Sequence, residues 1–156
     1  MTNSSHKFED LVDKDKYQVF VFCCPALIPV NFARHPWVVI NKNGEIHRWE
    51  IGDIKIGDSY IHKDVLPPFQ GIEYTRFIKN YFWKIELLGY IEGEDNSRVK
   101  DAINFIENSE VNYSYCKKYF IFGPNSNTYI QNILNKFPEF NIKLSWRFIG
   151  KNFRIR

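Results

Sequence analysis

Three side chains in this sequence could together perform nucleophilic catalysis: His35, His47 and Ser126. A serine hydroxyl attacks a carbonyl only if a base takes its proton at the moment of attack. Histidine is suited to that role near neutral pH, and a second imidazole can orient the first. The sequence must therefore be examined for elements that could bring these three residues together.

Ser126 lies in the segment Gly123-Pro124-Asn125-Ser126-Asn127-Thr128-Tyr129. Gly-Pro ends whatever structure precedes it, and the Asn, Ser and Thr residues that follow are those that cap helices. We expect a helix from here to about Lys136. A helix N-terminus offers free N–H groups and partial positive charge. This position therefore suits a nucleophile or an anion, or it serves only as a cap.

The two histidines flank a predicted β-hairpin. Asn43-Gly44 separates two runs rich in β-forming residues, and Asn-Gly is a strong hairpin signal. His35 and His47 could lie at the same end of the paired strands with their side chains close together. Alternatively, they are polar residues on the surface of the hairpin. A metal site is a further alternative, although no third ligand is evident, so we expect neither a metal nor another cofactor.

This order of features resembles the circularly permuted papain-like fold of the NlpC/P60 superfamily, especially its lecithin:retinol acyltransferase-like branch. That branch has an Arg-His-Trp-like stretch entering a strand, a second His after a turn, and an Asn-Cys motif opening a helix. Here Arg34-His35-Pro36-Trp37, His47 and Asn125-Ser126 stand at these places. The resemblance implies that His35 is the general base, that His47 orients it and that Ser126 replaces the cysteine nucleophile.

The chain is also similar to an uncharacterised bacterial family. That family is marked by a Gly-Pro-Asn-Ser-Asn-Thr-aromatic motif, a His-x-Trp strand, an Arg-Trp-Glu strand and a terminal Gly-Lys-Asn/Asp-aromatic motif. The motifs stand here at 123–129, 35–37, 48–50 and 150–153. Asn125 and Asn127 would then be candidates for substrate binding. Trp37 and Trp49 would either line a substrate groove or belong to the core.

Two functions follow from these residues. The first is a small hydrolase or acyltransferase that acts on an amide or ester through Ser126, His35 and His47. The second is a catalytically inactive relative that uses the same cleft to bind a peptide, a lipid or a partner protein. In that case Asn125 or Ser126 only caps the helix, a contribution of typically ~1 kcal/mol.

The order of the expected strands and helices predicts a single α+β domain over residues 17–156, with an antiparallel sheet and packed helices. A polar lead-in at 1–16 precedes it. Its strands come early in the chain and its helices come later. We expect strands at 17–24, 34–40, 45–51, 84–92 and 119–122, and helices at 73–82, at 99–106 and after Gly-Pro.

Composition narrows the functional classes. The 21 basic and 18 acidic residues give a net charge of +3, which is too balanced for a nucleic-acid-binding surface. The three cysteines, Cys23, Cys24 and Cys116, form neither a disulfide framework nor a zinc motif. We therefore predict that Cys23 and Cys24 are small core hydrophobes. With no apolar signal core and no run long enough to span a membrane, we expect a cytoplasmic protein.

Overall fold

Two long apolar runs near the start of the chain form the centre of an antiparallel sheet. In the computed structural model, which describes residues 5–154, these runs are β1 (Tyr17–Pro25) and β2 (Arg34–Lys42). The chain continues through β3 (Glu45–Ile56), β4 (Ser59–Lys63) and β5 (Glu86–Gly93). The strand order is β4-β3-β2-β1-β5, with every neighbouring pair antiparallel. The predicted antiparallel sheet is confirmed.

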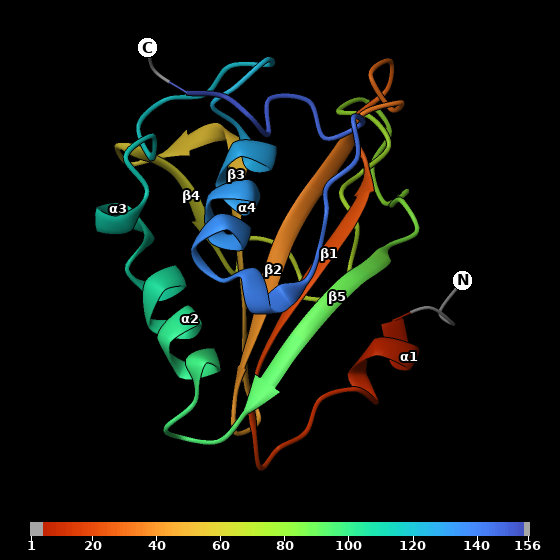
Figure 1. Cartoon of the computed structure of the whole chain (residues 1–156). Coiled ribbons are helices and arrows are strands. Elements are labelled where there is room, and N and C mark those ends of the chain that lie inside the picture. The colour runs from red at the N-terminus through yellow and green to blue at the C-terminus, as the bar shows by residue number, and fades with distance from the viewer. Residues whose placement is uncertain (1–4, 155–156) are drawn as a thin grey trace.

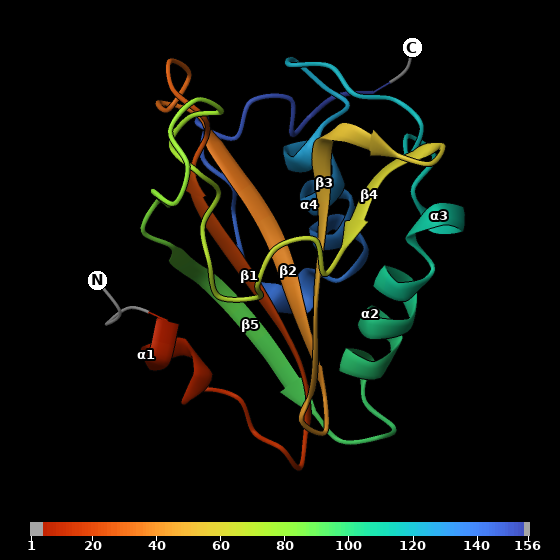
Figure 2. The same ribbon diagram turned by 180° about the vertical axis from the view of Figure 1, so that it is seen from behind.

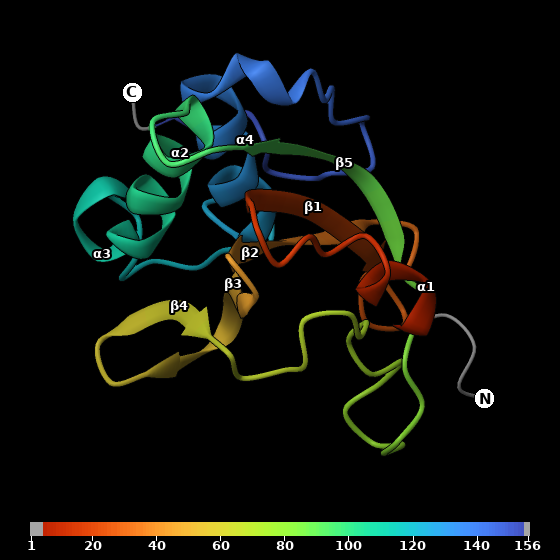
Figure 3. The same ribbon diagram turned by 90° about the horizontal axis from the view of Figure 1, so that it is seen from below.

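Helices cover one face of this sheet (Figures 1 and 3). They are α2 (Arg98–Glu107), α3 (Ser109–Asn112), α4 (Ser126–Lys136) and the 3-10 helix η1 (Pro138–Phe140). Apolar residues of α2 and α4 pack on alternate residues of the central strands. This group, the helix-side core, includes Val38, Ile40, Trp49, Ile103 and Ile130. The α+β class is therefore confirmed, as is the packing of helices on the sheet.

The other face is covered by the segment that links β4 to β5 and by the short helix α1 (Ser5–Glu9), as Figures 2 and 3 show. The remaining side chains of the central strands point this way. They form a loop-side core that includes Phe20, Phe22, Trp37, Val39 and Phe69. The sheet is therefore buried on both faces, which explains why β1 and β2 read as continuous apolar runs rather than as alternating ones.

The Asn-Gly turn forms as predicted. Asn43 and Gly44 both have positive φ, at 52° and 96°, which is what a two-residue hairpin turn between twisted strands requires. The turn fixes the register of the hairpin, so Val38 pairs with Trp49 and Ile40 pairs with His47.

The helix predicted at 73–82 is wrong. Glu73 and Phe82 instead form an isolated antiparallel bridge, and the chain between them turns back on itself. The helical spacing of Phe77, Ile78 and Tyr81 had suggested a buried face, but these side chains are exposed. The apolar residues near this segment that do pack on the loop-side core, Ile72 and Trp83, lie on either side of it.

The strand predicted at 119–122 is also wrong. The Phe120 N–H donates to the carbonyl of Pro124, and the Gly123 N–H donates to the carbonyl of Phe120, so the segment closes into a turn. Phe120, Ile121 and Phe122 are largely exposed.

The lead-in packs more closely than expected. Phe8 meets Phe22 edge-on, with ring centroids 5.2 Å apart, and Val12 packs on the loop-side core. The Gln18 side chain accepts from the Asp13 N–H and donates to the Leu11 carbonyl. Residues 1–4 and 155–156 of the predicted lead-in and domain lie outside the described residues.

Candidate functional site

The hairpin register separates the two histidines. His47 pairs with Ile40, which lies five residues along β2 from His35. At a rise of about 3.3 Å per residue, that is roughly 16 Å along the strand. The side chains also differ in direction, because side chains alternate between the two faces of a strand. The expectation that His35 and His47 lie together at one end of the hairpin is therefore wrong.

His35 belongs to a charged cluster on the loop side of the sheet. Its Nε2 lies 2.8 Å from Oε2 of Glu50, and its ring stacks on Trp37. Arg48 donates to the same Glu50 oxygen at 2.8 Å and lies over the Trp37 ring, 4.1 Å from its centroid. Arg48 also donates to the carbonyls of Pro67 and Gln70. The cluster therefore fastens the β4–β5 segment to the sheet.

The ionisation of Glu50 depends on these partners. Burial acts to raise the pKa of Glu50, but the hydrogen bond from His35 and the charge of Arg48 outweigh it, and the pKa falls to about 2. Arg48 and Glu50 are both buried. In a buried ion pair of this kind, each charge offsets the free-energy cost of removing the other from water. Removing either charge should therefore be strongly destabilising.

His47 lies in a different setting. Its Nδ1 is 2.6 Å from Oδ2 of Asp64, and its Nε2 is 2.8 Å from Oε1 of Glu45. The hydrogen bond to Glu45 raises the pKa of His47, and Asp64 adds to this effect while partial burial opposes it. Both ring nitrogens are thus engaged by carboxylates, which suits a protonated imidazolium and leaves no nitrogen free to orient His35.

Ser126 is the first residue of α4 and lies on the other side of the sheet from His35. It is buried, and it stands four residues before Ile130, so it shares the helix face that packs on the helix-side core. Among the side chains of residues 7–154, no hydrogen bond joins the Ser126 hydroxyl to a histidine. The structure therefore does not bring together the three residues of the expected triad.

The rest of the motif at 123–129 holds the C-terminal segment in place. The Asn125 Oδ1 accepts from the N–H groups of Asn127 and Thr128, and the Thr128 hydroxyl accepts from the Asn125 N–H, a complete capping box. The Asn125 Nδ2 then donates to the carbonyls of Ile121 and Ile149, at 2.9 and 3.1 Å. One side chain thus caps α4 and also bridges two loops.

Two further contacts join the same segments. The Asn127 Nδ2 donates to the Ile149 carbonyl at 2.7 Å, and the Thr128 hydroxyl donates to the Gly150 carbonyl at 2.7 Å. Gly150 has a φ of 86°, and a Cβ there would lie 2.7 Å from the Asn125 Nδ2, so this close approach requires glycine. Asn125 and Asn127, predicted to bind substrate, both donate their amide N–H groups within the fold, whereas the buried Oδ1 of Asn127 has no hydrogen-bond partner among the described residues.

The two tryptophans predicted to line a groove or the core lie in the core. Trp37 has no exposed surface, and its Nε1 donates to the Pro68 carbonyl at 3.0 Å. Trp49 is buried on the opposite face, in the helix-side core. Cys23 and Cys24 are likewise buried, and burial raises the pKa of their thiols to about 12 and about 11. They are core residues, as predicted, and burial disfavours the reactive thiolate.

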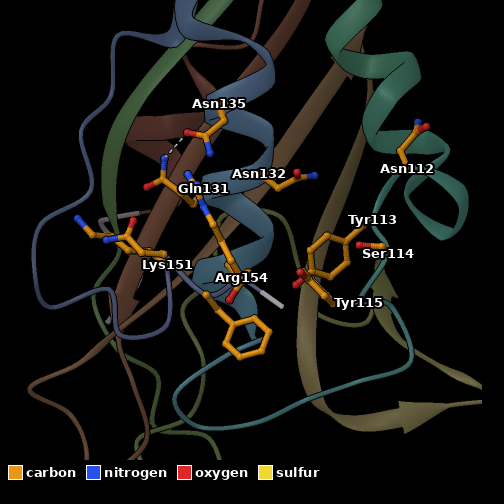
Figure 4. A pocket seen from close by; sticks show the side chains of 12 residues that line it. Asn112, Tyr113, Ser114, Tyr115, Gln131, Asn132, Asn135, Lys151 and Arg154 are labelled. Carbon is orange, nitrogen blue, oxygen red and sulfur yellow. Dashed lines mark hydrogen bonds between the residues drawn. The ribbon is translucent and has the colours of Figure 1, made fainter. Parts of the chain in front are cut away.

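A cavity of about 320 Å³ lies beside α4 and is lined by that helix, by residues 112–115 and by residues 151–154 (Figure 4). Gln131, Asn132 and Asn135 are the polar residues of the middle of α4 that line it. Its lining is mostly amide and hydroxyl groups, with three aromatic rings and two cations: Asn112, Tyr113, Ser114, Tyr115, Thr128, Gln131, Asn132, Asn135, Lys151, Asn152, Phe153 and Arg154. We refer to this cavity as the α4 groove.

Sequence reasoning missed both groups of residues that the fold assembles. The Glu50 partner of His35 could have been suspected, since His-x-Trp and Arg-Trp-Glu stand on adjacent strands whose register the Asn-Gly turn fixes. The α4 groove gave no such signal, because Gln131, Asn132 and Asn135 read as the solvated face of a helix. In residues 5–154 no three His, Cys, Asp or Glu side chains are grouped so as to hold a metal ion.

Comparison with known proteins identifies a family whose function is unknown. A family model described as a protein of unknown function (DUF3750) matches residues 16–153. No curated protein and no solved structure matches the chain. Within the described residues, none of the helices has both the length and the apolar character needed to cross a membrane.

The Glu50 cluster predicts a specific dependence of stability on pH. The pKa of Glu50 falls from the unfolded value of 4.5 to about 2, so its contribution is complete above 4.5 and is lost as the pH falls toward 2. The wild type should therefore have a higher free energy of unfolding than Glu50→Gln. This difference between the two proteins should be about 2 kcal/mol smaller at pH 3 than at pH 6. Urea unfolding of both proteins at each pH measures this. If the difference between the two proteins does not change with pH, Glu50 is not stabilised as an ionised partner of Arg48 and His35. The control is Glu94→Gln, which replaces an exposed glutamate.

The double role of Asn125 predicts that aspartate cannot replace it. Aspartate caps helices as well as asparagine does, but it has no N–H to donate to the carbonyls of Ile121 and Ile149. Asn125→Asp and Asn125→Ala should each lower the unfolding free energy by about 2 kcal/mol or more. Asn135→Ala, at an exposed position of the same helix, should cost at most about 0.5 kcal/mol. If Asn125→Asp is neutral, Asn125 acts only as a cap.

Proposed function

The chain belongs to the DUF3750 family of proteins of unknown function, and from the geometry of its own residues we propose that it is a binding module for a short acidic peptide segment. The segment would lie in the α4 groove. The observation that carries the proposal is the chemistry of the groove: amide and hydroxyl groups with two cations, and no carboxylate in the lining.

The amide side chains favour a peptide. Gln131, Asn132 and Asn135 stand along one helix and each offers both a hydrogen-bond donor and an acceptor. A peptide backbone presents the same two groups at every residue, so an extended segment could pair with several of these amides. Tyr115 and Phe153, whose rings meet edge-on, add apolar surface to the lining of the groove, where a side chain of the segment could pack.

The cations favour acidic residues in that segment. Lys151 donates from its Nζ to the Leu144 carbonyl, which holds the ammonium group beside the groove. Arg154 is exposed and offers a planar guanidinium that can bind a carboxylate through two hydrogen bonds.

We further propose that the chain keeps the element order of a permuted papain-like domain without its catalytic centre. The hairpin comes first and the helix that begins at Ser126 comes later, as in that fold. A hydrolase or acyltransferase acting through Ser126 would need His35 on the helix side of the sheet. Turning His35 to that side requires a one-residue slip of β2, which would also move the fully buried Trp37 out of its core.

A fluorophosphonate probe tests the catalytic alternative. We expect no labelling of Ser126 in the native protein, because none of the imidazoles in residues 7–154 forms a hydrogen bond with its hydroxyl. Intact-mass analysis after incubation measures the adduct, with a trypsin-like protease as positive control. Stoichiometric labelling that is lost in Ser126→Ala and in His35→Ala would overturn the binding proposal in favour of an enzyme.

Side-chain amide signals in the NMR spectrum test peptide binding directly. On titration with a five-residue peptide of alternating glutamate and glycine, the amide signals of Gln131, Asn132 and Asn135 should shift with a saturable dependence. Arg154→Ala should weaken binding about tenfold, the loss expected for one charge-assisted contact. The peptide with lysine in place of glutamate should bind more weakly.

The matched control is Lys143→Ala, an exposed lysine outside the α4 groove, which should leave the affinity unchanged. The proposal fails if the shifts map elsewhere on the protein or if the lysine peptide binds equally well.

A further inference from the structure

Seven large apolar side chains are exposed at one end of the molecule. They are Ile28, Val30, Phe32, Phe120, Ile121, Phe122 and Trp146, and they are 47%, 42%, 52%, 61%, 68%, 79% and 76% exposed. We call this set the apolar rim. Its residues come from three segments distant in sequence: the loop between β1 and β2, the turn before α4 and the C-terminal segment. In Figures 1 and 2 all three lie at the end of the sheet where β2 begins.

Hydrogen bonds hold these three segments side by side. The Arg147 Nε donates to the Phe32 carbonyl at 2.7 Å, and the Arg34 N–H donates to the Arg147 carbonyl at 3.0 Å. Asn125 in turn joins the carbonyls of Ile121 and Ile149. The segment that carries Trp146 is thus tied to the loop of Phe32 and to the turn of Phe120 to Phe122. The fold therefore holds the three segments of the rim together at this end of the sheet.

The three segments of the rim carry mainly positive charge, and Glu86, an exposed carboxylate beside them at the start of β5, is paired with Arg34. After Glu110 the only acidic residue in the sequence is Glu139, which is paired with Arg98. The loop at 26–34 contains no acidic residue. The segments that carry the apolar rim also carry Lys117, Lys118, Lys143, Arg147, Lys151 and Arg154.

We propose that the apolar rim docks the protein on the surface of an anionic lipid bilayer. Aromatic side chains concentrate at the boundary between lipid and water, and basic residues beside them are attracted to anionic headgroups. The described helices do not span a bilayer, so the contact would be peripheral.

The shape of the rim favours a bilayer over the other partners of negative charge. Its side chains protrude from separate loops, which a fluid interface can accommodate without a matching surface. A nucleic acid would use stacking platforms, but Val30 and Ile121 cannot stack on bases. This proposal goes beyond the binding of a peptide in the α4 groove and does not depend on it.

Flotation with extruded vesicles tests the proposal. The full chain should float with vesicles of 30% phosphatidylglycerol in phosphatidylcholine and should bind pure phosphatidylcholine at least tenfold more weakly. The double variant Phe122→Ser with Trp146→Ser should reduce binding to the anionic vesicles at least tenfold. Lys117→Glu with Lys118→Glu should do the same, and 0.5 M NaCl should weaken the wild type.

The matched control is Ile54→Ser with Val111→Ser, which removes two exposed apolar side chains outside the rim and should leave vesicle binding unchanged. Circular dichroism and melting temperature establish that each variant is folded. The proposal is overturned if the wild type stays in solution with anionic vesicles, if the control variant loses binding as strongly as the rim variant, or if the rim variant still floats. Self-association or nucleic-acid binding through the rim in place of flotation would also overturn it.

Discussion

The alternation of side chains along β2 is the constraint on which the rest of the structure depends. This strand lies at the middle of the sheet and is buried on both faces, so each residue is committed to one of two cores. Val38 and Ile40 face the helices, whereas Trp37 and Val39 face the β4–β5 segment. The strand cannot slip by one residue without exchanging both sets. His35 shares the direction of Trp37, and this fixes its partner as Glu50, the carboxylate to which Arg48 also donates.

The four motifs identified in the sequence form two separate structural clusters. His35-Pro36-Trp37 and Arg48-Trp49-Glu50 meet on adjacent strands, and their charged members fasten the β4–β5 segment over the sheet. The motif at 123–128 meets Gly150 on the other side, where Asn125 and Thr128 bind backbone carbonyls of the C-terminal segment. In both clusters a side chain satisfies backbone groups of a loop that has no secondary structure of its own. The chain uses these residues to order loops, which is a role that motif spacing alone does not reveal.

The sequence was sufficient to predict elements whose pattern is local. The strands β1 to β3, the Asn-Gly turn, α2 and the capped start of α4 all follow from apolar runs, turn residues and caps. The α+β class with an antiparallel sheet followed from their order. The site was less predictable, because the distance between His35 and His47 depends on register and the separation of His35 from Ser126 depends on which face each residue occupies. The number of residues between two positions in the sequence determines neither the strand register nor the face of the sheet on which each side chain lies.

The segment at 119–122 shows why apolar patterns mislead at the surface. Phe120, Ile121 and Phe122 were predicted to be a strand because apolar residues usually form elements that are buried within the fold. A sequence pattern indicates only that these side chains avoid water and does not identify what covers them. In the fold they are exposed on a turn that Asn125 stabilises. Keeping such side chains in water is unfavourable, whereas a lipid interface or a partner would remove them from it. The same residues that were wrongly predicted as a strand therefore carry the strongest argument for an external surface that binds the protein.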